Sequence, residues 1–347
     1  MTKRAGIITF HNAENYGAAL QTYALMKTLQ GLGCDTEVVD YRNRGVFKRN
    51  LIKSLYYALT FQTPLKNIRI YRQFQRHYLQ LSPRPYHTLA EFAADAGRYD
   101  YLFFGSDQIW NPDLSNGFDP LYFGQFSTPA KKIAYAASVG KDQLTSEERQ
   151  TINRLIQNFD AVSVREETLL PLLDGEVECV VDPCMLLAGE AWDHIAGETK
   201  MDSEYILVYQ LFPNKTLLQA ALQFARDQNM RVALISPYPT FQGRGQVVKL
   251  GRISPTDFLA YYRHAHLVLS DSFHGTLFSI LFHKPFYTLL PAAKTGRITS
   301  LLEKLNLSDR IIDQPVAELQ PVDYSRVEPL LQAEIQRSLD YIRRSLA

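Results

Sequence analysis

No run of apolar residues in this sequence approaches the roughly 20 that a membrane-spanning helix requires. The best candidate, TLFSILF at 276–282, stops at His283, Lys284 and Pro285. The apolar run at 5–10, near the N-terminus, is shorter than the apolar region of a signal peptide. We therefore expect a protein of the cytoplasm.

Cysteine is scarce, and the three cysteines, Cys34, Cys179 and Cys184, form no CxxC pair. Without an even disulfide framework, they indicate buried thiols in a reducing compartment rather than metal ligands. Net charge is nearly absent as well, because 37 basic and 36 acidic residues leave +1 at pH 7. A chain without an overall positive field gives no indication of nucleic-acid binding.

Acidic residues are missing from one long segment. Residues 41–90 contain no Asp or Glu, but they contain ten Lys or Arg and nine aromatic residues. Two interpretations stay open: a solvated helical insertion, or a basic amphipathic surface for anionic lipid headgroups or an anionic lipid-linked substrate. Nucleic acid is a third option, but no RNA- or DNA-binding motif accompanies the segment.

The sequence does contain a repeated strand–helix–strand pattern. The apolar run at 5–10 is followed by a helical pattern that closes at Gly31 and Gly33, and then by a second strand, DTEVVDY. Such units predict parallel sheets. The pattern restarts after about residue 187. We therefore predict an α/β fold of two Rossmann-like domains that face each other across a cleft.

The length of 347 residues also favours more than one domain. We predict an N-terminal domain at 1–187 with a basic helical insertion at about 42–90, and a C-terminal domain at 188–322. The helical stripe at 323–347 is expected to pack back on the N-terminal domain. Ligands of such sheets bind outside the carboxyl ends of the strands, which places the expected site in the cleft.

Polar residues cluster just after four of the predicted strands. The first cluster, HNAENYGAALQ, lacks the GxGxxG spacing of a dinucleotide site, and its helix N-terminus suits an anion. The second, FFGSDQIWNP, combines polar side chains with an indole, which suits a sugar. Either loop, taken alone, is better explained as an ordinary turn than as a binding site. Their candidate acceptor contacts are His11, Asn12, Asn15, Tyr16, Ser106, Gln108, Trp110 and Asn111.

The third cluster, SVREETL, opens with Arg165, which is either an anion ligand or the ion-pair partner of Glu166 or Glu167. In the fourth, LSDSFHGT, His274 starts a helix. That histidine is either a cap or core residue, or a general acid that delivers its proton beside a bound phosphate. Its small polar neighbours leave room for a ligand: Asp271, Ser272, Gly275 and Thr276.

Six motifs resemble, in this order, those of the polysaccharide pyruvyl transferase family, over about residues 5 to 310. They are HNAENYGAALQTYAL, FFGSDQIWNP, YAASVG, VSVREETL, VVDPCMLL and SDSFHGTLFSILFHKPF. The resemblance implies a GT-B-like fold. It also implies transfer of the pyruvyl group of phosphoenolpyruvate to two hydroxyls of a sugar, with formation of a cyclic ketal and release of phosphate. Phosphoenolpyruvate would be a co-substrate, with no other cofactor and no metal, in the synthesis of a bacterial surface polysaccharide.

The resemblance assigns donor binding to Arg165 and the role of general acid to His274. The family has an arginine two residues before that histidine, whereas this chain has Ser272. We expect Arg297, at the start of the next helix, to supply the missing charge. Ser272, Gly275 and Thr276 are further candidate donor contacts, and either Asp107 or Asp271 would deprotonate the sugar.

Two alternatives stay open. One is a GT-B-type glycosyltransferase that uses a nucleotide-sugar, and the other is a non-catalytic glycan-binding member of a polysaccharide assembly system. The expected acceptor is a sugar, free or lipid-linked. The basic segment adds the expectation of peripheral contact with the anionic inner face of the membrane.

Overall fold

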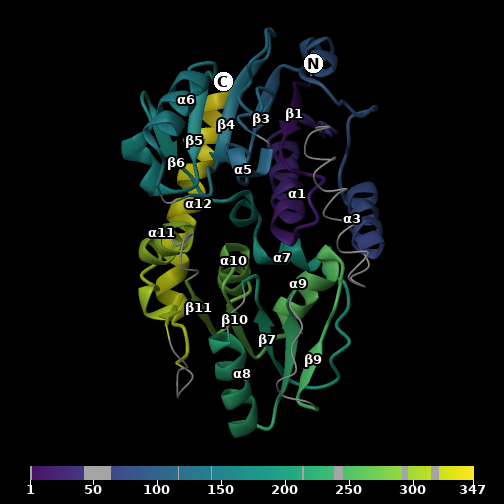
Figure 1. The fold of residues 1–347 in the computed structure, drawn as a ribbon, viewed down its shortest axis with the longest axis vertical. Coiled ribbons are helices and arrows are strands. Elements are labelled where there is room, and N and C mark those ends of the chain that lie inside the picture. Colours follow the sequence, from purple (N-terminus) through teal and green to yellow (C-terminus); the bar gives the residue numbers. More distant parts are fainter. Residues whose placement is uncertain are drawn as a thin grey trace. The chain divides into compact units, whose positions relative to one another are not determined.

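The structure is a computed structural model that describes residues 2–42, 64–115, 117–141, 143–212, 215–237, 245–290, 296–313 and 320–347. The chain divides into two compact units (Figure 1). Unit 1 comprises Met1–Leu187 and Glu334–Ala347, and unit 2 comprises Ala188–Ala333. Residues 43–63 of the predicted basic insertion lie outside the described residues. Among the helices described, none is long and apolar enough to cross a membrane.

Unit 1 is built on a six-stranded sheet in which all paired strands are parallel. Its order is β2-β1-β3-β4-β5-β6. Strands such as YLFF are buried along their whole length, as is expected of a parallel sheet covered on both faces. The strands are β1 (Arg4–Ile8), β2 (Asp35–Val38), β3 (Tyr101–Phe104), β4 (Lys131–Ala137), β5 (Ala161–Val164) and β6 (Val177–Cys179).

The helices of unit 1 start at residues that suit helix N-termini. Asn15 caps the first, and Thr145 with Glu148 forms a capping box on the sixth. The α-helices are α1 (Tyr16–Gly31), α3 (Pro64–Tyr78), α4 (Leu89–Ala93), α5 (Pro112–Ser115) and α6 (Ser146–Ile156). The 3-10 helices are η1 (Ala96–Arg98), η2 (Glu167–Leu172) and η3 (Pro183–Leu186).

Unit 2 repeats this architecture with a second parallel sheet in the order β12-β11-β10-β7-β8-β9. Its strands are β7 (Tyr205–Tyr209), β8 (Arg231–Ile235), β9 (Val247–Lys249), β10 (Leu267–Ser270), β11 (Phe286–Leu289) and β12 (Ile311–Ile312). Its helices are α7 (Gly189–Asp193), α8 (Thr216–Asp227), α9 (Pro255–His264), α10 (Phe273–Leu281), α11 (Gly296–Lys304) and η4 (Ser308–Arg310). The predicted α/β class is therefore confirmed.

The last helix, α12 (Tyr324–Leu346), contributes residues to both units. In unit 2, the Tyr324 hydroxyl donates to the carbonyl of Lys284 over 2.7 Å. In unit 1, the Tyr341 hydroxyl donates to the carbonyl of Ala134 over 2.9 Å. The residues from Glu334 onward thus complete the packing of the first sheet.

The order of the strands places one topological switch point in each unit. In unit 1 the chain reverses direction across the sheet between β1 and β3, and in unit 2 it does so between β7 and β10. In open α/β sheets, ligands bind beyond the carboxyl ends of the strands at such points. Three of the four polar loops singled out in the sequence follow β1, β3 and β10, so they lie at these two positions, whereas the loop with Arg165 follows β5.

Candidate functional site

The loops after β1 and β3 are joined by a buried hydrogen-bond network. The Thr9 hydroxyl donates to the carbonyl of Ser106 over 3.0 Å. The Gln21 side chain, from α1, donates to the Thr9 hydroxyl over 3.0 Å and accepts from the Ser106 N–H over 3.2 Å. This network fixes the turn that presents Asp107.

Asp107 sits at a sharp turn directly after β3. Its φ is 67°, and the preceding Gly105 has φ 116°, where an added Cβ would lie 2.3 Å from the Tyr135 carbonyl oxygen. Glycine is therefore required at 105 by both its backbone conformation and its lack of space. The Asp107 side chain keeps 14% of its surface exposed, so its carboxylate is accessible to a ligand.

Arg165, which follows β5, is buried among carboxylates. Its Nη1 donates to Oδ2 of Asp182 over 2.6 Å, and its Nη2 lies 4.0 Å from Oδ1 of Asp107. Glu166 is the other neighbour, 3.8 Å from Nε. Burial acts to lower the pKa of Arg165, but the nearby carboxylates raise it on balance. Of the ion-pair partners anticipated from the sequence, Glu166 lies within reach, but the hydrogen-bonded partner is Asp182, which the sequence did not indicate.

His11 is not available to an acceptor, contrary to the expectation from the sequence. Its ring is 1% exposed, and its Nε2 lies 3.1 Å from Oδ1 of Asp40. Arg42 donates to both oxygens of the same carboxylate. Burial acts to raise the pKa of Asp40, but hydrogen bonds and charge from His11 and Arg42 lower it to about 2. The histidine thus belongs to a buried ionic cluster that holds the end of β2.

The remaining residues of that loop are more accessible. Asn12 and Asn15 are exposed, and Tyr16 is partly buried against Tyr71. Asn15 also accepts the N–H of Ala18 over 3.1 Å, so it caps α1. A sugar contact by Asn12, Asn15 or Tyr16 stays a prediction.

Trp110 is a core residue, and the prediction that its indole contacts a sugar is wrong. It has no exposed surface, its Nε1–H donates to the Tyr122 carbonyl over 3.2 Å, and its ring stacks on Phe123 at 5.5 Å. Ser106 is likewise fully buried, and its hydroxyl donates to the Ala136 carbonyl. Because neither side chain reaches solvent, neither can contact an acceptor.

Two amides of the same loop hold it together. Asn111 is buried, donates to the Gln108 side chain over 3.1 Å and accepts the N–H of Asp113. The amide of Gln108 packs so closely on Gly140 that an added Cβ would lie 1.8 Å from its oxygen. Asn111 therefore acts within the loop, whereas Gln108 keeps part of its surface exposed and stays a candidate acceptor contact.

In unit 2, Asp271 joins the two strands of the switch point. Its Oδ1 accepts the N–H of Leu211 over 2.6 Å, and its Oδ2 accepts the N–H of Phe212 over 2.9 Å. Burial raises the pKa of Asp271 to about 6, although these hydrogen bonds act in the opposite direction. Because each oxygen already accepts a backbone N–H, the carboxylate primarily fixes the loop after β7.

The first turn of α10 packs directly on β10. Ser272 is the N-cap and accepts the N–H of Gly275 over 3.4 Å. An added Cβ at Gly275 would lie 2.0 Å from Oγ of Ser270. The buried hydroxyls of Thr276 and Thr288 form a hydrogen bond of 2.8 Å. Gly275 and Thr276 therefore serve the packing of the helix, and a contact of either residue with the donor stays a prediction.

His274 and Arg297 both contact Phe273. The imidazole of His274, which is 8% exposed, lies edge-on to the Phe273 ring at 5.2 Å. The guanidinium of Arg297, from the first turn of α11, lies 6.0 Å from the centre of the same ring. The structure therefore brings Arg297 to the N-terminal turn of α10. This is where Arg297 was expected to replace the positive charge of the family arginine, whose position Ser272 occupies in this chain.

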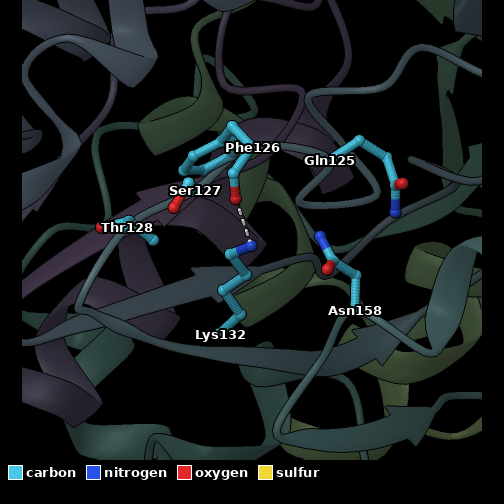
Figure 2. A pocket seen from close by; sticks show the side chains of 6 residues that line it. All are labelled: Gln125, Phe126, Ser127, Thr128, Lys132 and Asn158. Atoms are coloured by element: carbon cyan, nitrogen blue, oxygen red, sulfur yellow. Dashed lines mark hydrogen bonds between the residues drawn. The ribbon is translucent and has the colours of Figure 1, made fainter.

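A separate hollow of about 400 Å³ in unit 1 contains none of the predicted residues (Figure 2). Its polar groups hold one loop in place. The Lys132 ammonium donates to the Gly124 and Phe126 carbonyls, and the Asn158 amide donates to the same Gly124 oxygen. Burial lowers the pKa of Lys132. The residues around the hollow are Gln125, Phe126, Ser127, Thr128, Lys132 and Asn158.

Solved structures with a similar fold are GT-B proteins, so the predicted GT-B-like fold is confirmed. UDP-GlcNAc 2-epimerase from Neisseria meningitidis, bound to UDP-GlcNAc, is 11% identical with a TM-score of 0.52, over 99% of each chain. The epimerase from Rickettsia bellii is 13% identical with a TM-score of 0.51, over 99% of this chain and 98% of that one. At such identities the likeness establishes the fold alone.

The family model for polysaccharide pyruvyl transferase matches residues 15–291, so the chain belongs to the polysaccharide pyruvyl transferase family. No curated protein sequence matches it. The matched range contains Arg165 and His274 but ends before Arg297. Arg297 therefore lies outside the part of the sequence that the family model matches, whereas Phe273, which it contacts, lies inside it.

Proposed function

We propose that this protein transfers the pyruvyl group of phosphoenolpyruvate to two hydroxyls of a sugar, forming a cyclic ketal and releasing phosphate. Family membership supports a pyruvyl transferase. The observation that carries the proposal is the meeting of His274 and Arg297 at Phe273. A proton donor and a cation that contact the same ring at a helix N-terminus suit a donor that is an anion and must be protonated on carbon.

The reaction begins with proton transfer from His274 to the methylene carbon of phosphoenolpyruvate. Protonation converts the methylene carbon into a methyl group, reduces the double bond to a single bond and leaves an oxocarbenium-like centre at C2. One sugar hydroxyl attacks C2 and loses its proton to a base. The C2–O bond to phosphate then breaks, and its electron pair leaves with the phosphate. A second hydroxyl of the same sugar bonds to C2 and gives its proton to the departing phosphate, while the proton held by the base returns to His274 through solvent. Arg297 would bind the phosphate throughout.

We assign the base to Asp107 rather than to Asp271. Asp107 keeps 14% of its side-chain surface exposed, whereas Asp271 is 2% exposed and accepts a backbone N–H on each oxygen. A general base must come within hydrogen-bond distance of the proton that it removes, which favours the exposed carboxylate. Arg165, 4.0 Å from Asp107, would contact the carboxylate of the donor.

The direct test is the release of phosphate from phosphoenolpyruvate in the presence of glycan acceptors, with wild type and His274→Gln. Glutamine keeps the size and hydrogen bonding of the side chain but is no acid, so turnover should fall about 10²–10⁴-fold. His264→Gln is the matched control, because His264 is exposed at the end of α9 in the same unit. Equal turnover in His274→Gln would reduce His274 to a packing residue.

Ligand binding separates this proposal from the nucleotide-sugar alternative. Phosphoenolpyruvate should raise the melting temperature of wild type and of His274→Gln alike, and should act less on Arg297→Ala. If Arg297 replaces the charge absent at Ser272, then Ser272→Arg should restore part of the effect in Arg297→Ala. Stabilisation by UDP- or GDP-sugars, with none by phosphoenolpyruvate, would contradict the proposal.

A further inference from the structure

Helix α3 presents a row of arginines on its exposed face. Arg69, Arg72 and Arg76 are all exposed, and their spacing of three and four residues places them on one side of the helix. The aromatic residues Tyr71 and Phe74 are buried on the opposite side. The row rises by about 10 Å along the helix axis, from 1.5 Å per residue.

The aromatic side fixes this helix on α1, and Figure 1 shows the two helices next to each other. Tyr23 of α1 meets Phe74 and Tyr78 edge-on at 6.4 and 6.2 Å, and these two rings of α3 stack at 5.1 Å. The buried amide of Gln75 donates to the His11 carbonyl over 3.0 Å. The three arginines are therefore displayed on a helix that is attached to the body of unit 1.

The three arginines form no ion pair among the residues that the structure describes, because no carboxylate oxygen there lies within 4.0 Å of their side chains. Residues 41–90 contain no Asp or Glu at all. Helix α12 differs, because three of its exposed arginines each pair with a carboxylate three residues earlier. These pairs are Arg326 with Asp323, Arg337 with Glu334 and Arg343 with Asp340.

We propose that the arginine face of α3 docks the protein on an anionic lipid bilayer. An evenly spaced row of like charges on a convex helix suits the spread charge of a bilayer surface. A single phosphate would instead need several donors that converge on one point. The aromatic rings of α3 are buried against α1, so they are not available for insertion into lipid or for stacking on bases. The contact is thus electrostatic, reversible and sensitive to salt.

The test measures partitioning onto phosphatidylcholine vesicles with and without phosphatidylglycerol. Each basic residue near such a surface contributes about a fivefold factor, so Arg69→Gln/Arg72→Gln/Arg76→Gln should lower the partition coefficient roughly 100-fold. The matched control Arg326→Gln/Arg337→Gln/Arg343→Gln changes the net charge equally and should bind like wild type. Replacing the three α3 arginines by lysine should also preserve binding, because a bilayer responds to charge rather than to the guanidinium fork.

Several results would overturn the proposal. Wild type could bind vesicles equally well with and without phosphatidylglycerol, or the α3 glutamine variant could bind like wild type. The partition coefficient of the α12 control could also fall as far as that of the α3 glutamine variant. Loss of binding in the lysine variant, with competition by inorganic phosphate, would indicate a discrete phosphate site. Tighter binding to a DNA oligonucleotide than to vesicles would indicate nucleic acid. Circular dichroism and thermal unfolding of the α3 variant must match wild type, as expected for exposed side chains.

Discussion

The guanidinium of Arg165 and the carboxylate of Asp182 form a buried ion pair at 2.6 Å. Removal of one partner leaves the other charge buried, which typically costs about 3–5 kcal/mol, even where the intact pair adds little stability. We therefore expect Arg165→Ala to lower the free energy of unfolding by about that amount, as measured by urea denaturation. Arg165→Ala/Asp182→Ala should be more stable than the sum of the single changes predicts.

The same pair allows the structural and donor-binding roles of Arg165 to be separated. Arg165→Lys keeps the charge but loses the planar fork, so it should weaken phosphoenolpyruvate binding more than it weakens the fold. The comparison uses donor affinity and urea denaturation on one preparation. Unchanged donor affinity in a folded Arg165→Lys protein would leave the arginine a purely structural role.

Asp271 should give the protein a specific pH dependence. Its pKa is raised from 3.8 to about 6 by burial, so the folded state binds this proton more tightly than the unfolded state does. The resulting stabilisation is full below pH 3.8 and is lost as the pH rises through about 6. It amounts to about 3 kcal/mol, at 1.36 kcal/mol for each unit of pKa.

The measurement is the free energy of unfolding at pH 4 and at pH 7 for wild type and Asp271→Asn. Wild type should lose about 2 kcal/mol more than the variant over this interval, because asparagine does not titrate and pH 4 already lies above the unfolded-state pKa of 3.8. Asp202→Asn, which removes an exposed carboxylate of the same unit, should follow wild type. Parallel pH profiles for wild type and Asp271→Asn would show that Asp271 does not titrate in this range.

A methyl group at residue 275 should destabilise unit 2. The added Cβ would lie 2.0 Å from Oγ of Ser270 and 2.9 Å from the hydroxyl of Tyr262. Overpacking of this kind typically costs about 1–3 kcal/mol, and Gly275→Ala should lower the melting temperature accordingly. Ser270→Gly should restore part of the loss. Gly97→Ala is the control, since no atom lies within 4 Å of a Cβ at that position.

Trp110 should matter for stability and not for sugar recognition. Trp110→Ala removes a fully buried ring and should cost about 3–5 kcal/mol. Trp110→Phe keeps a ring against Phe123 and should bind glycans like wild type. Thermal unfolding measures the stability of each variant, and titration calorimetry with the acceptor measures glycan binding. Asn12→Ala, at an exposed loop residue, tests in parallel whether Asn12 contacts the acceptor. Weaker glycan binding by a stable Trp110→Phe protein would reinstate the indole as a ligand contact.

Most of the sheet could be predicted because its strands are short, continuous apolar runs separated by helical patterns. The apolar run LVLS forms β10, and the helical pattern SPTDFLAYYRHA at 254–265, which starts with Ser-Pro, contains α9. The strands β9 and β12 were missed, since they have three and two residues and too little pattern to recognise.

The site was harder to predict, because the direction of a side chain depends on partners far away in the sequence. The sequence offers Glu166 or Glu167 as ion-pair partners of Arg165 if it is not an anion ligand, whereas its hydrogen bond goes to Asp182, 17 residues later. His11 lies in a polar loop but pairs with Asp40, 29 residues away. The only signal for Asp182 was its place just after a strand in VVDP, which resembles the place of Asp107 after β3.

The assignment of Glu334–Ala347 to unit 1 has a consequence for synthesis on the ribosome. The Val181 N–H donates to the hydroxyl of Ser338, so the edge of the first sheet is complete only after the intervening 188–333 have been made. At 5–20 residues per second, that delay is roughly 7–30 s. During it, unit 2 can fold while the nascent first unit exposes apolar surface that Tyr341 and Ile342 later cover. Chaperone demand should therefore fall on the half of the protein that emerges first.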